Sequence, residues 1–317
     1  MISLKISQLK THALVLLMIT GISQHAYADT DSCRCVAFRL DDIQDYYLNN
    51  VQIEIINTFQ KKDASLTIGI IGNYFGNDQK IVSFVTEKLK NNDPPIEVAN
   101  HGWNHEDFTL FDKVGQSSLI KKTNEKVFKV LGVSPIGFIT PFNVLNNDTL
   151  TALHENDIQY ISANVTKDRP PYNISDDALY HFPGTALTGN LNDDDTDWLS
   201  TTHKETFAQV QGSLVNYGFA VVMLHPQEYS TREGLNYTNQ VDLNQIHELE
   251  LLIDEIRNSG LRIVAIKEIP QYVTVHQRVP EWVKNIFVWY ENKKITETEV
   301  LDAIHFLTKN EIIKFYI

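Results

Sequence analysis

The chain has 317 residues, of which 43% are hydrophobic and 10% aromatic, so it can bury a large core and is neither disordered nor fibrous. Its 40 acidic residues outnumber its 27 basic residues, and the net charge is −13. This balance argues against a nucleic-acid partner or an anionic lipid surface, since phosphate binding needs clustered Lys and Arg.

The N-terminal segment predicts export. Residues Met1–Ala28 combine Lys5 and Lys10 with an apolar run at 13–22 and a small-x-small pattern at 26–28, which is typical of a cleavable signal peptide. The apolar run has ten residues, too few to cross a hydrocarbon core of roughly 30 Å. We therefore expect a secreted or cell-surface, extracellular protein that does not span a membrane.

The two cysteines, Cys33 and Cys35, leave their bonding open. Export implies an oxidising environment, but a bridge between positions two apart is strained. A bridge to another chain and two free thiols are the alternatives. Since no cysteine framework exists, stability must come from the hydrophobic core.

From Arg34 to Ile269, short β-branched runs alternate with helical patterns, which predicts a parallel α/β sheet or barrel. About seven such units favour a (β/α) barrel over an open sheet. The run Ala220–Leu224 is apolar throughout, which indicates burial on both faces. The expected strands are 36–40, 66–71, 96–100, 136–140, 160–165, 220–224 and 261–266. The expected helices, which have apolar side chains at 3.6-residue spacing, include 51–59, 81–89, 118–131, 207–215 and 241–256.

Residues 167–197 interrupt this alternation. They hold Pro170, Pro171, Pro183 and the acidic run 193–195, and they predict a long excursion over the surface. Loops of this length in a compact domain are often functional, and a solvated insertion without a role is the alternative.

The composition changes after Pro280. Two helical patterns follow, at 281–290 and 297–307. About forty residues rarely build an independent core, so we expect this tail to dock on the main domain or on a partner.

Polar side chains stand at the ends of four expected strands. In a parallel barrel the carboxyl ends of the strands meet at one face, where catalytic residues lie. The residues concerned are Asp41 and Asp42 after the first strand, His101 and His105 after the third, Pro141, Phe142 and Asn143 after the fourth, and His225 after the sixth.

These residue types together predict metal-assisted hydrolysis. Two imidazoles four residues apart on a helical turn can face one divalent ion, and a carboxylate from another strand completes three protein ligands. A second carboxylate can accept a proton from water, and a histidine on the far side can protonate a leaving amine. For both Asp41 and Asp42 to enter the site, the chain must leave strand geometry there, because neighbouring side chains on a strand point to opposite faces.

In this order, Asp41-Asp42, His101-x-x-x-His105, the Pro-Phe-Asn strand end and Leu224-His225 resemble the successive motifs of the NodB-type polysaccharide deacetylases, carbohydrate esterase family 4. The resemblance covers most of Cys35–Ile269 and implies a distorted (β/α)7 barrel. It implies Asp41 as general base, His225 as general acid, and Asp42, His101 and His105 as metal ligands. It also implies that Pro141, Phe142, Asn143 and Leu224 contact the substrate, with Leu224 lining the pocket for the acetyl methyl group.

Two positions depart from the family pattern. Ile43 stands where the family usually has Gly after the two Asp residues, and Ile139 stands where its third motif usually has an Arg that orients the base. Asn143 is one candidate for the missing polar contact, and Arg39 is the nearest arginine. The missing Arg bears on the substrate class more than on metal binding.

Three further residues have two interpretations each. Trp103 could stack on a sugar or could simply pack. Trp198 could border the site together with Asp197. Glu228 could orient His225 from behind, although a surface position is the ordinary expectation for a glutamate.

The tail has a resemblance of its own. Residues 279–285, Trp289-Tyr290, 294–296 and 312–314 are similar to a short helical module at the C-termini of secreted archaeal proteins. This similarity implies a cell-surface partner, and the alternative is a cap over an apolar edge of the barrel. The expected organisation is a signal peptide at 1–28, a NodB-like barrel at 29–279 and a two-helix module at 280–317.

The expected function is that of a secreted, metal-dependent hydrolase that removes N-acetyl groups from a glycan. Zinc is the leading metal because the ligands are borderline, and cobalt, nickel, iron or manganese could substitute. One alternative is a hydrolase of another non-peptide C–N amide bond on a small substrate, which the missing Arg motivates. The other is a non-catalytic glycan- or surface-binding protein.

Overall fold

A computed structural model describes residues 34–91, 93–165, 172–173, 179–192, 198–272, 286 and 288–309. The chain divides into two compact units, one of residues 32–273 and one that contains 274–317 together with 1–31. The expected signal peptide and Cys33 lie outside the described residues. Cys35 is disulfide-bonded, so it is not a free thiol.

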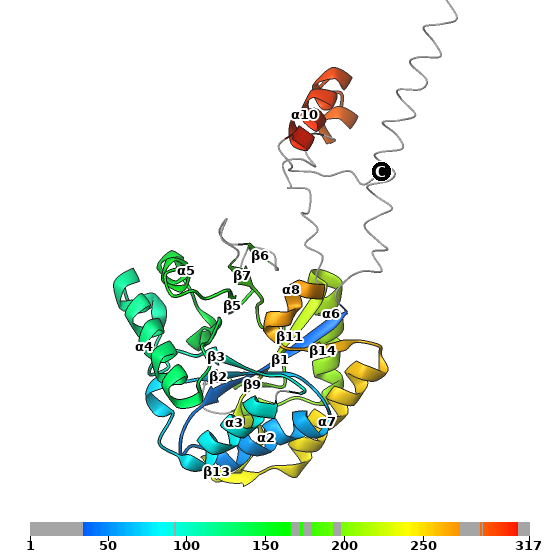
Figure 1. The fold of residues 1–317 in the computed structure, drawn as a ribbon. Coiled ribbons are helices and arrows are strands. Elements are labelled where there is room, and N and C mark those ends of the chain that lie inside the picture. Colours follow the sequence, from blue (N-terminus) through cyan, green and yellow to red (C-terminus); the bar gives the residue numbers. More distant parts are fainter. Residues whose placement is uncertain are drawn as a thin grey trace, which may run out of the picture. The chain divides into compact units, whose positions relative to one another are not determined.

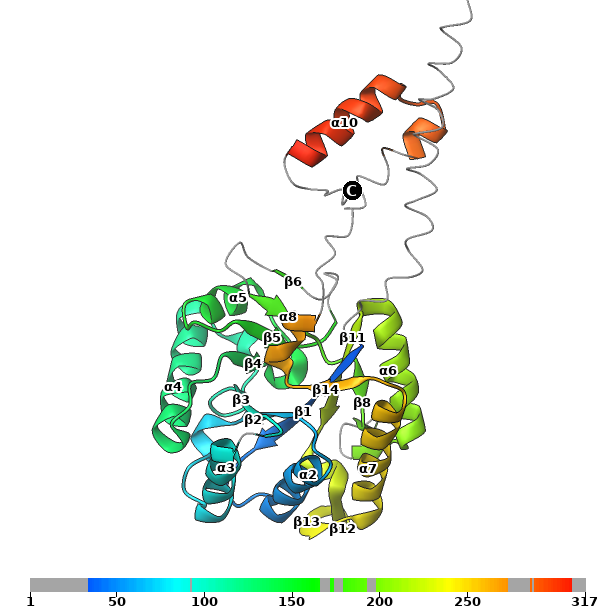
Figure 2. The same ribbon diagram turned by 45° about the vertical axis from the view of Figure 1, so that its right-hand side comes forward.

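The larger unit is built on a curled, mainly parallel sheet (Figures 1 and 2). The strand order is β6-β7-β5-β4-β3-β2-β1-β11-β8, and β14 pairs with the start of β1. The strands are β1 Cys35–Ile43, β2 Leu66–Ile70, β3 Ile96–Asn100, β4 Gly137–Ile139, β5 Tyr160–Ser162, β6 Tyr172–Asn173, β7 Tyr180–His181, β8 Ala186–Leu187, β11 Phe219–Leu224 and β14 Arg262–Val264. All seven strands expected from apolar runs are therefore present.

A single segment, residues 180–187, joins the two ends of this sheet. Its first half is β7, which runs parallel to β5, and its second half is β8, which runs parallel to β11. Between them the Gly184 amide donates to Ala163 and the Thr185 amide donates to Val221. The segment thus supplies the seventh position of a distorted (β/α)7 barrel, and the expectation of a plain surface excursion over 167–197 is wrong here. The pairing was not predictable locally because both partner strands are distant in sequence.

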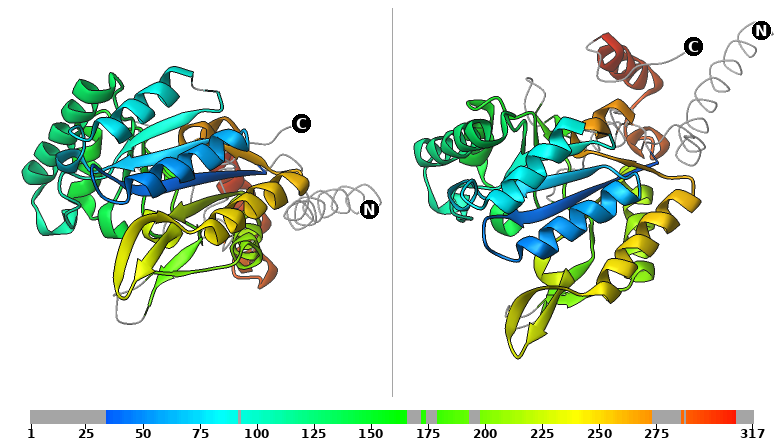
Figure 3. Two further views of the ribbon diagram at one scale, coloured as in Figure 1. Left: turned by 90° about the horizontal axis from the view of Figure 1, so that it is seen from below. Right: turned by 60° about the horizontal axis from the view of Figure 1, so that its bottom comes forward.

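Helices cover the outside of the sheet. In Figure 3 the blue helix α2 and the yellow helix α7 lie against the blue strand β1, and residues of all three share one hydrophobic core cluster. Several helices begin at side-chain caps, such as Asp112 before α4 and Thr202 before α6. The main helices are α2 Asn49–Lys61, α3 Gln79–Asn91, α4 Lys113–Leu131, α5 Asn147–His154, α6 His203–Tyr217, α7 Leu243–Asn258 and α8 Ile269–Tyr272. The sequence pattern missed α5.

Two antiparallel hairpins were not expected from the sequence. One pairs β9, Gly189–Leu191, with β10, Trp198–Ser200. The other pairs β12, Ser230–Glu233, with β13, Asn236–Val241, and follows directly after His225 and the short helix η4, Pro226–Tyr229. The two hairpins touch, because Arg232 donates to the carbonyl oxygen of Trp198 at 2.6 Å.

The described part of the smaller unit contains helix α10, Glu297–Lys309, which matches the second helix expected in the tail. Residues 288–290 and Ile286 are also helical. Ile286, Val300 and Leu307 form a small buried cluster of their own. Among the described residues of the chain, no helix combines the length and the hydropathy that a membrane crossing requires.

Candidate active site with a divalent-metal centre

Asp41 and Asp42 both enter the site because β1 is irregular at this point. The pairing of β1 with β2 shifts register between Leu40 and Ile43, and Asp42 has a φ of 63°. A bulge of this kind re-aims a side chain at the end of a strand. This confirms that the chain leaves regular strand geometry at the two aspartates.

Asp42, His101 and His105 come together at one face of the barrel. Each offers one ligand atom, and these atoms lie within 4.8 Å of one another. His101 Nε2 is 3.4 Å and His105 Nε2 is 3.5 Å from Asp42 Oδ1. One carboxylate and two imidazoles are a common ligand set for zinc and related divalent ions.

The hydrogen bonds of His101 fit it for metal binding. Its Nδ1 donates to the carbonyl oxygen of Ile139 at 2.8 Å, which places the proton on Nδ1 and the lone pair on Nε2. Nε2 is buried and has no hydrogen-bond partner in the described part of the chain. An orphaned buried nitrogen beside a carboxylate and a second imidazole suits a divalent cation, so the residues present fit a metal ion.

The His101–His105 segment is a loop and not a helical turn, which corrects the sequence expectation. Gly102 and His105 both have positive φ, at 78° and 60°, and Glu106 accepts hydrogen bonds from the amides of Trp103 and Asn104. The two rings nevertheless meet, with centroids 4.9 Å apart. The spacing therefore produces a ligand pair through a tight turn that the carboxylate of Glu106 holds.

The charges of the ligand cluster favour an ionised carboxylate and a neutral imidazole. Burial alone would raise the pKa of Asp42, but the adjacent His101 imidazole, with the charges of His225 and His105, lowers it well below its ordinary value. Burial, aided by the charge of His101, lowers the pKa of His105. Both shifts favour the protonation states that bind a cation.

Asp41 and His225 form a second pair beside the ligand cluster. His225 Nε2 is 3.7 Å from Asp41 Oδ2. On its other side, His225 Nδ1 donates to Glu228 Oε1 at 3.0 Å. Burial would lower the pKa of His225, but the hydrogen bond to Glu228 and the charge of Asp41 raise it. The interpretation of Glu228 as the residue that orients His225 is confirmed.

The ring of His225 is also covered by an aromatic side chain. Trp198 stacks on it with ring centroids 4.0 Å apart and planes 29° apart. Trp198 comes from β10, and its amide donates to the hydroxyl of Tyr237 on β13. Trp198 therefore borders the site as one interpretation expected, whereas Asp197 lies outside the described residues. Trp103 is partly buried, with the Lys122 ammonium over its ring.

The expected substrate-contacting residues occupy different environments. Phe142 is 59% exposed and its ring centroid is 4.7 Å from that of His105. Pro141 is buried, and Asn143 points inward and accepts a hydrogen bond from Arg39. Leu224 is fully buried in the core cluster that also contains Leu40, so the acetyl-pocket role expected for it stays a prediction that this burial does not favour.

Arg39 contacts Asp41, and sequence reasoning had named it only as the nearest arginine. Its Nη2 is 3.1 Å from Asp41 Oδ2, and its Nη1 donates to the carbonyl oxygen and the hydroxyl of Ser162. Sequence reasoning missed Ser162 altogether. Its place within the expected strand 160–165 was the only available signal.

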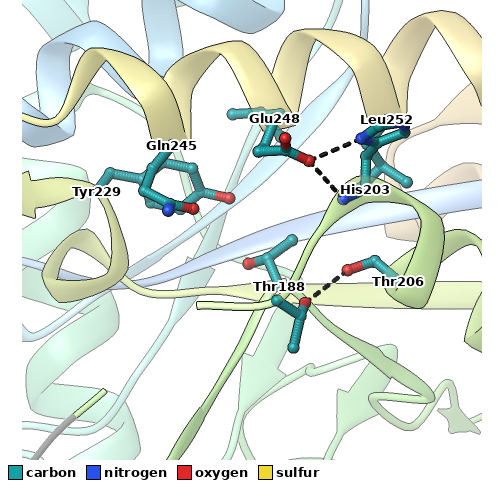
Figure 4. A pocket seen from close by; sticks show the side chains of 9 residues that line it. Thr188, His203, Thr206, Tyr229, Gln245, Glu248 and Leu252 are labelled. Atoms are coloured by element: carbon teal, nitrogen blue, oxygen red, sulfur yellow. Dashed lines mark hydrogen bonds and ion pairs between the residues drawn. The ribbon is translucent and has the colours of Figure 1, made fainter. Parts of the chain in front are cut away.

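A separate cavity lies beside the start of α6 and α7 (Figure 4). His203 lines it and forms a 2.7 Å contact from Nδ1 to Glu248 Oε2. Thr188 also lines it, and the Thr188 hydroxyl donates to Glu228 Oε2. The cavity thus lies next to the residues that hold His225, although no candidate catalytic residue lines it.

The fold and the site together define a distorted (β/α) barrel that carries a candidate divalent-metal centre. Residues 28–161 match the family model described as polysaccharide deacetylase. Over this stretch, which is less than half of the chain, the sequence is similar to the polysaccharide deacetylase family. No curated protein matches the chain.

Solved structures agree with this fold. A protein from Mycobacterium smegmatis assigned to the polysaccharide deacetylases is 16% identical, with a TM-score of 0.58, and the match covers 78% of this chain and 92% of that one. A CE4 family pseudoenzyme from Bacillus anthracis is 13% identical, with a TM-score of 0.50, and the match covers 74% of this chain and 65% of that one. At these identities the likeness shows the fold alone.

Proposed function

We propose that this protein is a secreted, metal-dependent deacetylase that removes N-acetyl groups from a glycan. The observation that carries the proposal is the adjacency of two sets of residues. Asp42, His101 and His105 form one cluster, and Asp41 and His225 lie beside it as an acid–base pair. The match of residues 28–161 to the polysaccharide deacetylase model supports the reaction class, and the N-terminal pattern of the sequence supports export.

A divalent ion held by Asp42, His101 and His105 would supply Lewis-acid polarisation of the amide carbonyl and would lower the pKa of a water molecule. We propose zinc, since His and Asp are ligands that it accepts readily. Asp41 takes the proton of the attacking water. His225, whose pKa is raised by Glu228 and Asp41, gives a proton to the departing amine.

A chain-like substrate suits the surroundings of this site better than a small enclosed amide. Phe142 is exposed directly beside His105, and Tyr46 and Tyr74 are exposed on the segments that follow β1 and β2. Aromatic faces of this kind offer large, rigid contact area to a ligand that lies across the surface. A small-amide substrate is the second candidate, because Ile139 stands where the family usually has Arg.

A non-catalytic binding role is the third candidate, since the fold also occurs in a CE4 family pseudoenzyme. The presence of all five catalytic and ligand positions, Asp41, Asp42, His101, His105 and His225, argues against it.

The direct test is metal content of the purified mature protein together with acetate release from chitin oligosaccharides before and after chelation. We expect stoichiometric metal and acetate release that chelation abolishes. His101→Ala should lose both, and His247→Ala, an exposed histidine on α7, is the matched control. Metal without acetate would favour the small amide, and absence of metal would favour the binding role.

The substrate class has its own test. Phe142→Ala should raise KM for long oligosaccharides more than for short ones, and should leave the thermal stability nearly unchanged because the ring is exposed. An equal effect on all lengths would contradict an extended glycan site.

A further inference from the structure

The guanidinium of Arg39 lies inside the candidate active site. Arg39 precedes Asp41 by two residues on β1, so the two side chains leave the same face of the strand. Arg39 is fully buried and Asp41 is 2% exposed. Their contact, 3.1 Å from Nη2 to Oδ2, is therefore shielded from water.

Two other strand ends hold this guanidinium in place. Nη1 donates to the carbonyl oxygen of Ser162 at 3.0 Å and to its hydroxyl at 2.8 Å. Nη2 donates to Oδ1 of Asn143. Because guanidinium donors form a rigid planar fork, contacts on both terminal nitrogens fix its orientation.

This arrangement distinguishes the two oxygens of Asp41. Oδ2 faces Arg39 and His225. Oδ1 is buried and has no hydrogen-bond partner among the described residues. One oxygen is thus held, and the other is available to accept a proton.

Stability alone does not account for Arg39. Burial lowers its pKa, and the charge of Asp41 opposes that effect. A buried ion pair can often be replaced by apolar residues without loss of stability. A charged side chain kept in the barrel core, in contact with the proposed base, therefore indicates a role in the chemistry.

We propose that Arg39 is the positioning residue of the general base Asp41, and that Ser162 and Asn143 hold its guanidinium. It takes the place of the Arg expected at Ile139, whose side chain is buried and whose carbonyl oxygen is engaged by His101. The same function is thus supplied from β1 instead of β4. The expected effect of Arg39 on catalysis rests on the proposed function. The orientation of Asp41 by Arg39 rests only on the ion pair between them.

The test compares Arg39→Met, Arg39→Lys and Asn143→Gly with Arg262→Met, an exposed arginine on β14. Glycine suits position 143 because Asn143 has a φ of 58°. We expect Arg39→Met to keep stoichiometric zinc and a KM for chitin oligosaccharides within about threefold, while kcat falls about 100-fold or more. Arg39→Lys and Asn143→Gly should fall between it and the wild type, and Arg262→Met should match the wild type.

A crystal structure of the zinc-loaded Arg39→Met protein gives a measurement that does not depend on activity. We expect the Asp41 carboxylate to turn from its position while Asp42, His101 and His105 stay in place. If Arg39→Met does not fold, the structures and kinetics of Arg39→Lys and Asn143→Gly test the role of Arg39 instead. Each of these variants removes only part of the contacts that join Arg39 to Asp41, Ser162 and Asn143.

The two proposals fail in different ways. If the wild-type protein releases no acetate, the proposed function fails, and the orientation of Asp41 in the variant still decides the role of Arg39. If Asp41 keeps its orientation in the variants, or if kcat is unchanged in a metal-loaded Arg39 variant, the inference is overturned whatever the substrate.

Discussion

Trp198 and His225 stack on each other, with ring centroids 4.0 Å apart, although Trp198 lies on β10, before helix α6, and His225 follows strand β11, after that helix. The stack covers one face of the proposed general acid, while Glu228 holds its Nδ1. His225 is therefore fixed in both position and orientation before a substrate arrives. Fixed geometry of this kind lowers the reorganisation needed for proton transfer.

Removal of the indole should loosen His225. We expect Trp198→Ala to lower kcat about three- to tenfold, which corresponds to the loss of one aromatic pair, and Trp198→Phe to restore most of it. Leu199→Ala, an exposed neighbour on the same strand, is the control and should match the wild type. Equal rates for Trp198→Ala and the wild type would show that the stack has no part in catalysis.

Glu228→Gln should change the pH dependence. The charge and hydrogen bond of Glu228 raise the pKa of His225 against the opposing effect of burial. Because His225 must be protonated to act as an acid, activity falls as the pH rises through its pKa. Removal of the Glu228 charge lowers that pKa, so the alkaline limb of kcat/KM should move to lower pH.

The control for this profile is Glu250→Gln, which removes a carboxylate 3.7 Å from the exposed His247. Its alkaline limb should coincide with that of the wild type. A limb that stays in place in Glu228→Gln would mean that another group is the acid.

Metal should stabilise the fold by binding the native state. At a free zinc concentration of 100 times Kd, the expected gain is about 2.7 kcal/mol in the free energy of unfolding. The melting temperature of the wild type should therefore rise by several degrees on zinc addition and fall again with chelator. Asp42→Asn removes the charge shared by His101 and His105, and its melting temperature should not respond. A full response in Asp42→Asn would place the metal elsewhere.

Gly102 should be required for the geometry of the ligand loop. It has a φ of 78°, and a Cβ there would lie 3.1 Å from both Glu106 Oε2 and Pro141 Cγ. Gly102→Ala should lower the free energy of unfolding by about 1–2 kcal/mol and should also weaken zinc binding, measured by titration calorimetry, because the loop carries His105.

Gly132→Ala is the matched control for this change. Gly132 has a similar φ of 73°, but a Cβ there would meet nothing within 4 Å, and the residue ends helix α4. We expect a comparable loss of stability and unchanged zinc affinity. Equal zinc affinity in both variants would show that the turn at Gly102 does not set the ligand geometry.

The strands of the barrel could be located from the sequence because each is a short apolar run, and a strand buried on both faces needs such a run. The strand pairing between β5 and α6 could not be predicted, since β7 and β8 are two residues each and pair with strands distant along the chain. Helix α5 was missed because its eight residues contain only two large apolar side chains, Leu150 and Leu153. Two positions are too few to show a helical periodicity.

The order of the motifs was enough to name the residues of the candidate site, because the carboxyl ends of parallel strands must meet at one face. The backbone conformation between the two histidines could not be predicted from the sequence. His101 and His105 were expected on a helical turn, and they meet through a loop whose positive φ values the carboxylate of Glu106 supports.

Only the tertiary structure decided which arginine faces the proposed base. In the motif pattern, Ile139 stands where an arginine is expected, and Arg39 is one buried residue among many on β1. Whether its guanidinium reaches Asp41 depends on where the ends of β4 and β5 place Asn143 and Ser162. Those contacts join residues more than 100 positions apart, and no local pattern encodes them, because they exist only once the sheet has curled into a barrel.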